Sequence, residues 1–381
     1  MRIVYLLLHD FRFASIDFEE FALRRYHFAK EYARRMALLG NDVKLYVLST
    51  ELSETVRRHI DGYEIKGFKV SFLFPPFQGF GNSHAPDVLR ELEKDAPDLV
   101  HFHNYYLWSF PYVAWWIKRK GVPLVAQFHG TDPVKRFKGL GFLPILRLCD
   151  RILVPTKRES DFLSGSLHLP ENRISMTPST GVDTGLFRIV APKDNRTTIL
   201  YVGRIPRRRT YLVEKAPQFI IPIFRQLRSR GVDAKLIIAG DGPGLSALER
   251  ESQGLGNSIE FLGQVPQEEL PLLYSRSRLT FVPIHMDEIG PYWGGTVQES
   301  LACGTPVVAF NDKSPGIGKL GLLVPATGKE PAGLIAGALN NPDWLETVET
   351  EGPRVVAGTC EWGTLIAKLY ADYQRLVGPP R

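Results

Sequence analysis

The sequence predicts an α/β protein with two doubly wound domains, and three observations support this prediction. Short apolar, β-branched runs alternate with segments of helical periodicity, which is the pattern of parallel sheets covered by helices. A chain of 381 residues, 44% of them hydrophobic, is long enough to bury two sizeable cores. The hydrophobic pattern is lost over residues 188–197 and resumes directly afterwards. We therefore expect two domains joined by this linker.

The first domain is expected over residues 1–187. Its strands are predicted at 2–8, 43–48, 99–102, 123–128, 151–154 and 174–176. A helix is predicted over 21–39, because apolar residues recur at helical spacing there and Gly40 ends the pattern. The apolar run at the start is too short for a signal peptide and ends in His9 and Asp10, so we interpret it as the first strand.

The second domain is expected over residues 198–360. Its strands are predicted at 198–202, 235–239, 259–262, 279–283 and 306–310. Residues 361–381 have the apolar spacing of an amphipathic helix led by Trp362. On this pattern alone, the last segment is a surface helix of the second domain.

Composition and charge narrow the class of protein. The net charge of +6 at pH 7 suits phosphate-rich ligands or an anionic membrane surface as well as nucleic acid. Cys149, Cys303 and Cys360 are too few and too far apart for a disulfide framework or a metal cluster, which indicates a reducing compartment. No run approaches the roughly 20 apolar residues needed to cross a bilayer, so a soluble or peripheral protein is expected.

The most informative stretch runs from Gly294 to Phe310 and joins a glycine-rich turn, a short helix and a strand. Gly294 and Gly295 let the backbone approach a ligand closely, and the helix that follows presents free N–H groups to an anion. Glu299 lies about one turn into this helix, where its carboxylate can accept hydrogen bonds from a diol. The stretch therefore predicts a nucleotide-type anion site at the carboxyl edge of a sheet.

This stretch resembles the signature of the retaining family 4 glycosyltransferases, whose GT-B fold has two Rossmann-like domains facing a central cleft. Further motifs of that family follow in order: DLVHFH at 98–103, VAQFHG at 125–130, TP at 177–178, GVD at 181–183, LYVGR at 200–204, IAGDGP at 238–243 and FLG at 261–263. The resemblance implies that the first domain binds the acceptor, that the second binds the nucleotide sugar, and that the helix at 361–381 crosses back to the first domain.

The chemistry implied by the resemblance is transfer of a sugar from a nucleoside diphosphate donor to a hydroxyl, with retained anomeric configuration. Positive groups near the phosphates would stabilise the transition state, because a diphosphate leaves while the sugar carbon becomes cationic. Arg204, directly after a predicted strand, matches the family's arginine. The resemblance implies no metal, no cofactor and no nucleic-acid partner, and it leaves the base of the donor open.

The lysine that accompanies this arginine in the family is expected at Lys215. Residues 215–224 fit the helix that follows the family's lysine, although the segment before it is longer than usual, and Arg209 is the alternative. The three consecutive arginines at 207–209 either touch the donor phosphates or an anionic acceptor, or form a solvated face.

Glu299 matches the second glutamate of the family's paired-glutamate motif, which holds the donor ribose; a helix-capping carboxylate is the alternative. The first glutamate of that motif contacts the donor sugar, and this chain has Pro291 in its place. Glu288 is the nearest carboxylate, and it takes over that role if the loop is longer than in the family.

Three histidines follow or lie on predicted strands. His129 matches the family histidine that lies beside the transferred sugar, and a structural histidine is the alternative. His101 and His103 alternate on one strand, so both point to the same face and could mimic a metal pair. Because no third ligand accompanies them, we interpret both as structural.

The remaining donor contacts are expected from the resemblance in three loops. They are Gly294, Gly295 and Thr296 at the helix start, Gly240 and Asp241 in a tight turn, and Val265 in the loop that meets the base. The glycine loop that contacts phosphate in the first domain of the family is missing, because residues 11–16 lead directly into Asp-Phe-Glu-Glu at 17–20.

Two other classes of protein stay open. A dinucleotide-dependent oxidoreductase would share such domains, but no strand is followed by a GxGxxG run with an acid about 20 residues further on. A non-catalytic GT-B protein that serves as a binding or partner subunit is suggested by Pro291 and the missing glycine loop.

The acceptor also stays open among glycans, lipid-linked sugars and small molecules. The aromatic residues at 105–120, which end in a basic cluster, suit a buried helix, an interfacial helix or a sugar-stacking wall. The expected location is the cytoplasm, with a peripheral contact to the inner face of the membrane as a further option. The oligomeric state is not determined by any of these patterns.

Overall fold

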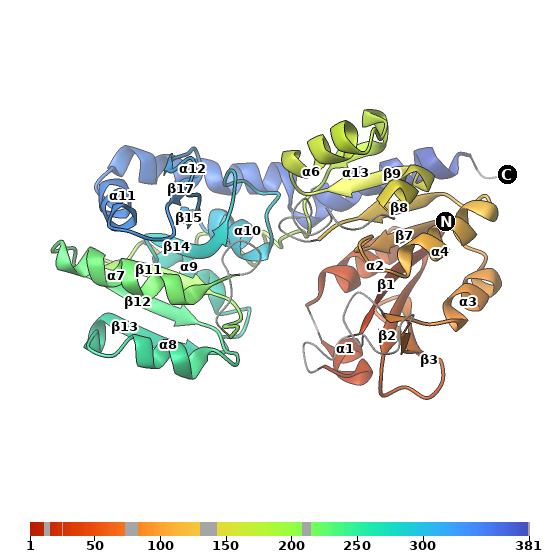
Figure 1. Cartoon of the computed structure of the whole chain (residues 1–381), viewed down its shortest axis with the longest axis horizontal. Helices are drawn as coiled ribbons and strands as arrows, with labels where there is room; N and C mark the ends of the chain where they lie inside the picture. Colours follow the sequence, from red (N-terminus) through yellow and green to blue (C-terminus); the bar gives the residue numbers. More distant parts are fainter. Residues whose placement is uncertain (11–15, 25, 73–82, 130–142, 208–214, 380–381) are drawn as a thin grey trace. The chain divides into compact units, whose positions relative to one another are not determined.

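The computed structural model describes residues 1–10, 16–24, 26–72, 83–129, 143–207 and 215–379. The chain forms two compact units, one of Met1–Ser179 with Leu365–Arg381 and one of Thr180–Thr364. In each unit, strands lie side by side in a sheet with helices packed against it (Figure 1), which confirms the predicted α/β class. The expected linker at 188–197 lies inside the second unit, because Phe187 before it already packs in that unit's core.

The first unit contains an eight-stranded sheet in the order β10-β9-β8-β7-β1-β2-β4-β3. The strands are β1 Arg2–Asp10, β2 Asp42–Ser49, β3 Val56–Ile60, β4 Tyr63–Lys69, β7 Leu99–His103, β8 Leu124–Gln127, β9 Arg151–Val154 and β10 Ile174–Met176; β5 Ser71–Phe72 pairs with β6 Ser83–His84 apart from this sheet. Only the edge pair β3–β4 of the large sheet is antiparallel, and its turn is Asp61-Gly62 with φ of 49° and 85°. Sequence analysis missed this hairpin, although an Asp-Gly pair is a known signal for it.

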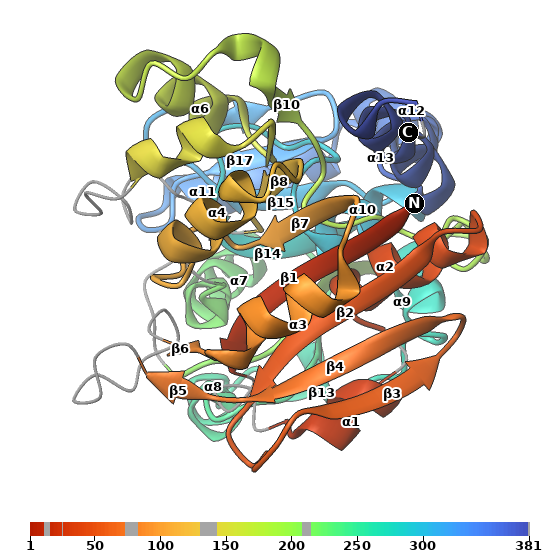
Figure 2. The same ribbon diagram turned by 90° about the vertical axis from the view of Figure 1, so that its right-hand side faces the viewer.

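The helices of the first unit cover both faces of its sheet. They are α1 Phe18–Leu23, α2 Phe28–Leu38, α3 Asp87–Asp95, α4 Phe110–Arg119 and α6 Lys157–Asp161, with short helical turns η3 Leu143–Leu148, η4 Phe162–Ser166 and η5 Glu171–Arg173. Figure 2 shows α3 and α4 on one face of the sheet and α2 on the other. The last helix, α13 Trp362–Val377, belongs to this unit from Leu365 onward.

The single helix predicted over 21–39 is wrong, because the structure has two helices there. His27 caps the start of α2 by accepting a hydrogen bond from the backbone of Ala29 (3.3 Å). The ammonium of Lys30 donates to carbonyls at the end of α1, including that of Ala22 (2.7 Å). Helical spacing is the same before and after this break, so periodicity alone could not locate it.

The aromatic segment at 105–120 supplies a helix of the first unit's core. Helix α4 buries Phe110, Val113 and Ile117, as expected for a core helix. On its outer side Trp115 is 52% exposed, and the guanidinium of Arg119 lies 4.7 Å from its ring centre. No helix in the described part of the chain is both long and apolar enough to cross a membrane.

The second unit contains a seven-stranded sheet in the order β13-β12-β11-β14-β15-β17-β16, parallel except for β16–β17. Its strands are β11 Thr197–Val202, β12 Ala234–Ala239, β13 Ile259–Gly263, β14 Leu279–His285, β15 Val307–Phe310, β16 Gly316–Ile317 and β17 Gly321–Val324. Its helices are η6 Pro217–Phe219, α7 Ile220–Ser229, α8 Leu245–Glu251, η7 Gly256–Ser258, α9 Leu270–Arg276, α10 Gly295–Ala302, α11 Glu330–Leu339 and α12 Pro342–Thr359. The strand order reverses between β11 and β14, and ligands of such sheets bind outside the carboxyl ends of the strands at this reversal.

One buried charge cluster ties α3 to the sheet of the first unit. Lys66 on β4 has a side chain only 3% exposed, and its ammonium contacts the carboxylates of Glu91 (3.0 Å) and Asp95 (2.7 Å). Burial would raise the pKa of Glu91, but hydrogen bonds from Lys94, Arg57 and Lys66 outweigh it and lower the pKa to about 2. The contact between α3 and the sheet at Glu91 and Asp95 therefore depends on the buried Lys66.

Replacing Lys66 by Met should lower the free energy of unfolding by about 3–5 kcal/mol at pH 7, because two carboxylates lose their buried partner. Lys94→Met is the matched control: it contacts the same Glu91, but its side chain is 59% exposed, so we expect a loss of about 0–1 kcal/mol. Urea unfolding at pH 7 measures both. Since the folded-state pKa of Glu91 is depressed, its stabilisation is present above pH 4.5 and is lost as the pH falls toward 2. Equal losses in the two variants would contradict this account.

Candidate functional site

A half-buried lysine lies at the strand reversal of the second unit. Lys215 follows the undescribed residues 208–214, and the backbone N–H of Ala216 beside it donates to Pro283 on β14 (2.9 Å). The Lys215 ammonium donates to the Val202 carbonyl at the end of β11 (3.0 Å) and to the Thr296 hydroxyl at the start of α10 (2.6 Å). An ammonium has three N–H groups, so one is left for a ligand.

The carboxylate of Glu299 lies one turn further along α10. Its Oε2 accepts a hydrogen bond from the Tyr274 hydroxyl (2.8 Å). Burial raises the pKa of Glu299, while this hydrogen bond and the charge of Lys215 lower it. Burial lowers the pKa of Lys215 to about 8, against the opposing effect of Glu299. The site therefore brings together one cation and one carboxylate, each held by internal partners.

Glycines in this site allow close backbone packing between strand ends. A Cβ on Gly240 would lie 1.9 Å from the carbonyl oxygen of Gly203, and both residues have φ near 150° (156° and 147°). The Gly240 N–H donates to Gly263 at the end of β13 (2.7 Å), and the Ile205 N–H donates to the Asp241 carbonyl (2.8 Å). The turn at Gly240 thus joins the ends of β11, β12 and β13.

Two of the predicted donor contacts in these loops have internal roles. The Asp241 carboxylate accepts a hydrogen bond from the backbone of Gly242 (2.6 Å), so part of it is used within its own turn. Val265, in the loop after β13, is half-buried and packs against the core of the second unit.

Of the arginines predicted to contact the phosphates, Arg204 and Arg207 lie in the described part of the chain, and Arg208 and Arg209 do not. Arg204 is exposed at the end of β11; its carbonyl accepts from the Tyr201 hydroxyl (2.7 Å), and its guanidinium has no hydrogen-bond partner among the described residues. Arg207 is exposed as well. Arg208 and Arg209 lie outside the described residues, so the choice between Lys215 and Arg209 rests on Lys215 alone.

The loop that departs from the family pattern lies between β14 and α10. Pro291 is buried, and its carbonyl accepts from the side-chain amide of Gln298 (2.8 Å), which also donates to the Thr180 carbonyl (2.8 Å). Glu288 is exposed and makes no hydrogen bond to a described residue. Gly294 caps α10 without a side chain, and Gly295 leaves room beside Glu299, whose Oε1 would lie 3.3 Å from a Cβ there.

His129 in the first unit is held at both ring nitrogens. Its Nδ1 lies 2.6 Å from the Ser179 carbonyl, which only accepts, so Nδ1 carries the proton. Burial lowers the pKa of His129 to about 3, so the ring is neutral and Nε2 accepts from His103 Nδ1 (2.8 Å). Phe28 stacks on the ring at 4.2 Å.

His101 and His103, on the neighbouring strand β7, also have structural contacts. The rings of His101 and His103 lie 4.3 Å apart, and His101 Nδ1 lies 2.5 Å from the hydroxyl of Tyr373 on α13. Over the ranges that the structure describes, no group of three or more His, Cys, Asp or Glu is placed to hold a metal ion. Sequence reasoning missed the His103–His129 contact, although His103 ends β7 and His129 follows the end of the neighbouring strand β8.

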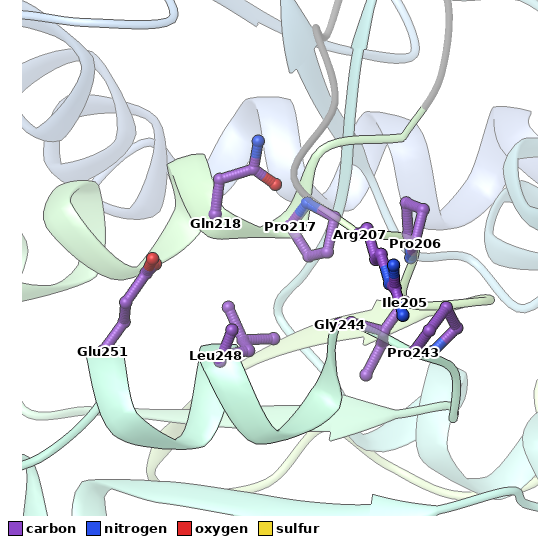
Figure 3. A pocket seen from close by; sticks show the side chains of 10 residues that line it. Ile205, Pro206, Arg207, Pro217, Gln218, Pro243, Gly244, Leu248 and Glu251 are labelled. Atoms are coloured by element: carbon purple, nitrogen blue, oxygen red, sulfur yellow. The ribbon is translucent and has the colours of Figure 1, made fainter.

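A cavity of about 220 Å³ lies beside the strand ends (Figure 3). It is lined by Ile205, Pro206, Arg207, Pro217, Gln218, Pro243, Gly244, Ala247, Leu248 and Glu251. Among the residues predicted to contact the donor, only Arg207 is part of this lining. The cavity is therefore distinct from the place where Lys215 and Glu299 meet.

Comparisons with known proteins identify the family of this chain. The glycosyltransferase family 4 model matches residues 27–186, and the model for glycosyl transferases group 1 matches residues 196–341. The D-inositol 3-phosphate glycosyltransferase of Thermobispora bispora is 28% identical over 403 residues, covering 90% of this chain and 87% of the relative.

Solved structures show the same fold. Sucrose-phosphate synthase from Thermosynechococcus elongatus superposes with a TM-score of 0.70 at 18% identity, covering 99% of both chains. HepE from Anabaena, solved in complex with UDP, gives a TM-score of 0.68 at 16% identity, covering 98% of this chain and all of HepE (100%). The chain is thus a glycosyltransferase, and it belongs to the family 4 glycosyltransferases of the GT-B fold.

Proposed function

We propose that this glycosyltransferase retains the anomeric configuration of the transferred sugar and neutralises the leaving diphosphate with Lys215 and Arg204 instead of a metal ion. The observation that carries the proposal is the position of the Lys215 ammonium between the end of β11 and the start of α10. Both are places where anions bind in α/β proteins.

The charges of the site suit the departure of a diphosphate. Lys215 offers one free N–H, and the start of α10 offers backbone N–H groups at Gly295 and Thr296. Arg204 is exposed just beyond the end of β11. Positive groups fixed in place before the reaction stabilise developing negative charge without the cost of reorganising solvent. No step then requires a bound cation.

Glu299 is suited to hold the donor ribose. Its Oε2 is used by Tyr274, and its Oε1 takes no hydrogen bond from a described residue, so it can accept from a ribose hydroxyl. Glu288 is a candidate for the transferred sugar, because it is an exposed carboxylate in the loop before α10. His129, in the first unit, has both ring nitrogens engaged, so we assign it no role in proton transfer.

The names of related proteins suggest the first substrates to test. HepE binds UDP, and relatives are named D-inositol 3-phosphate glycosyltransferases. UDP-sugars and D-inositol 3-phosphate are therefore the first donor and acceptor for this chain. The second candidate function, a binding subunit without turnover, is favoured by the buried Pro291 where the family has a glutamate.

The overall test is turnover of nucleotide sugars in excess EDTA. We expect hydrolysis or transfer to persist, with the anomeric configuration retained when the product is examined by NMR, because side-chain cations supply the positive charge. Loss of activity on chelation, restored by Mg²⁺ or Mn²⁺, would exclude the metal-independent mechanism. Tight donor binding without any turnover would favour the binding subunit.

Lys215→Ala and Arg204→Ala should each lower turnover by about 100-fold or more with the fold intact, the scale of losing one charge-stabilising group. Lys235→Ala, which removes a surface ion pair with Glu260 (2.6 Å) in the same unit, is the matched control and should stay near the native rate. Near-native turnover of Lys215→Ala would shift the role toward Arg209.

The same lysine should give the site a recognisable pH dependence. Since the pKa of Lys215 is lowered to about 8, the ammonium is lost as pH rises through this value, and affinity for a nucleoside diphosphate should fall about 10-fold between pH 7 and 9. Calorimetric titration measures it. Arg204→Ala should keep this pH dependence and Lys215→Ala should abolish it; a dependence that survives in Lys215→Ala would assign it to another group.

Glu288→Gln and Glu299→Gln should separate sugar binding from ribose binding. Glu288→Gln should weaken the intact sugar nucleotide but barely change affinity for the free nucleoside diphosphate, whereas Glu299→Gln should weaken both, because both ligands contain the ribose. Titration of each variant with both ligands checks this. If Glu288→Gln affects the two ligands equally, or neither, the backbone around Gly294 and Gly295 holds the sugar instead.

A further inference from the structure

We propose that Tyr274 is a positioning residue that aims and ionises Glu299, and that it thereby sets the preference of the site for ribose over 2′-deoxyribose. The inference rests on the proposed role of Glu299 in holding the donor ribose. No sequence motif marks Tyr274, which lies on α9, outside the loops that surround the strand reversal.

The geometry fixes the phenol firmly. Tyr274 is fully buried, and its ring packs edge-on against Phe187 with 6.2 Å between the ring centres. Its backbone carbonyl accepts from the hydroxyl of Thr305 (2.7 Å), directly after the helix that carries Glu299. The packing of its ring and the bond from Thr305 to its backbone thus hold Tyr274 in place. Its hydroxyl reaches Glu299 Oε2 at 2.8 Å.

The hydroxyl can only act as a donor toward this carboxylate. Burial raises the pKa of Tyr274 well above its ordinary value, and the negative charge of Glu299 raises it further, so the phenol keeps its proton. A hydrogen bond between a neutral donor and a buried carboxylate stabilises the ionised form. Tyr274 therefore opposes the effect of burial, which favours the protonated carboxyl.

The other titratable groups facing Glu299 cannot replace this contact. Lys215 is the cation that lowers the Glu299 pKa, but its two resolved hydrogen bonds go to Val202 and Thr296. Cys303 caps the end of the same helix, and burial raises its thiol pKa to about 12, so it is neutral at working pH. Orientation of the carboxylate is left to Tyr274.

How Glu299 binds a ribose depends on which of its two carboxylate oxygens is free. With Oε2 held by the phenol, Oε1 is turned to accept from a ribose hydroxyl. Without the phenol, the carboxylate can rotate and its pKa rises, so it binds the hydroxyl less well and becomes protonated at a higher pH. A 2′-deoxyribose lacks one of the hydroxyls, so its binding should respond much less.

The test is Tyr274→Phe, which removes only the hydroxyl. UDP, GDP and ADP are titrated by calorimetry, and the tightest is compared with its 2′-deoxy form from pH 5.5 to 7.5. We expect the native ratio of the two affinities to fall about 10-fold in the variant, the scale of a hydrogen bond to a charged group. The ratio should fall further at low pH in Tyr274→Phe, because the carboxyl is then protonated. Because both nucleotides carry the same diphosphate, the ratio of their affinities is not changed by titration of the phosphates.

Two controls separate this inference from the proposed function. Ser277→Ala removes another buried hydroxyl of the α9 region, one that donates to Leu273 (2.7 Å), and should leave the ratio unchanged. Glu299→Gln should abolish the ribose preference; if it does not, the proposed role of Glu299 fails. If Glu299→Gln abolishes it while Tyr274→Phe changes neither the ratio nor its pH dependence, the positioning role is overturned and the proposed function stands.

A double variant guards against a purely structural effect. If Tyr274 acts through Glu299, Tyr274→Phe combined with Glu299→Gln should lose no more affinity for the ribonucleotide than Glu299→Gln alone. Additive losses would show that the phenol acts on the fold and not on the carboxylate, and would overturn the inference. Thermal unfolding of each variant checks that the fold persists.

Discussion

The contact between Lys215 and the ends of two elements is the constraint on which the candidate site depends. Withdrawing an ammonium from water is costly unless polar partners replace the water, and for the half-buried Lys215 the Val202 carbonyl and the Thr296 hydroxyl supply them. Because these partners come from β11 and α10, the lysine ties together the strand reversal and the helix that carries Glu299. The same burial lowers its pKa to about 8, so its charge is sensitive both to pH and to an arriving anion.

The rest of the site divides into rigid and free parts. The turn at Gly240 is fixed by backbone contacts too close for any side chain, such as the 1.9 Å from a Cβ on Gly240 to Gly203. Glu299 is likewise held by a hydrogen bond from Tyr274. By contrast, Arg204 and Glu288 are exposed. Groups held in advance lower the cost of binding, whereas exposed groups gain their contacts only when a ligand arrives.

The departure from the family at Pro291 has a local physical basis. The loop before α10 is anchored through the carbonyl of Pro291, which accepts from Gln298 on that helix (2.8 Å). Proline has no N–H to satisfy, so its burial there leaves only this carbonyl to be bonded. A carboxylate at the same buried position would need a partner of its own, and the exposed Glu288 avoids that cost.

The sequence by itself determined most of the parallel strands of both sheets, the α/β class and the family, because these depend on local periodicity and on motifs with fixed spacing. It missed the strands β3, β4, β16 and β17. It also identified Lys215 and Glu299, which the structure brings together at one strand reversal. Only the tertiary structure decided the break before α2, the contact of Tyr274 with Glu299 and the pairing of His103 with His129. The two contacts join side chains from separate elements, so they depend on packing that leaves no periodic pattern in the sequence. The break was missed because helical spacing is the same on both sides of it.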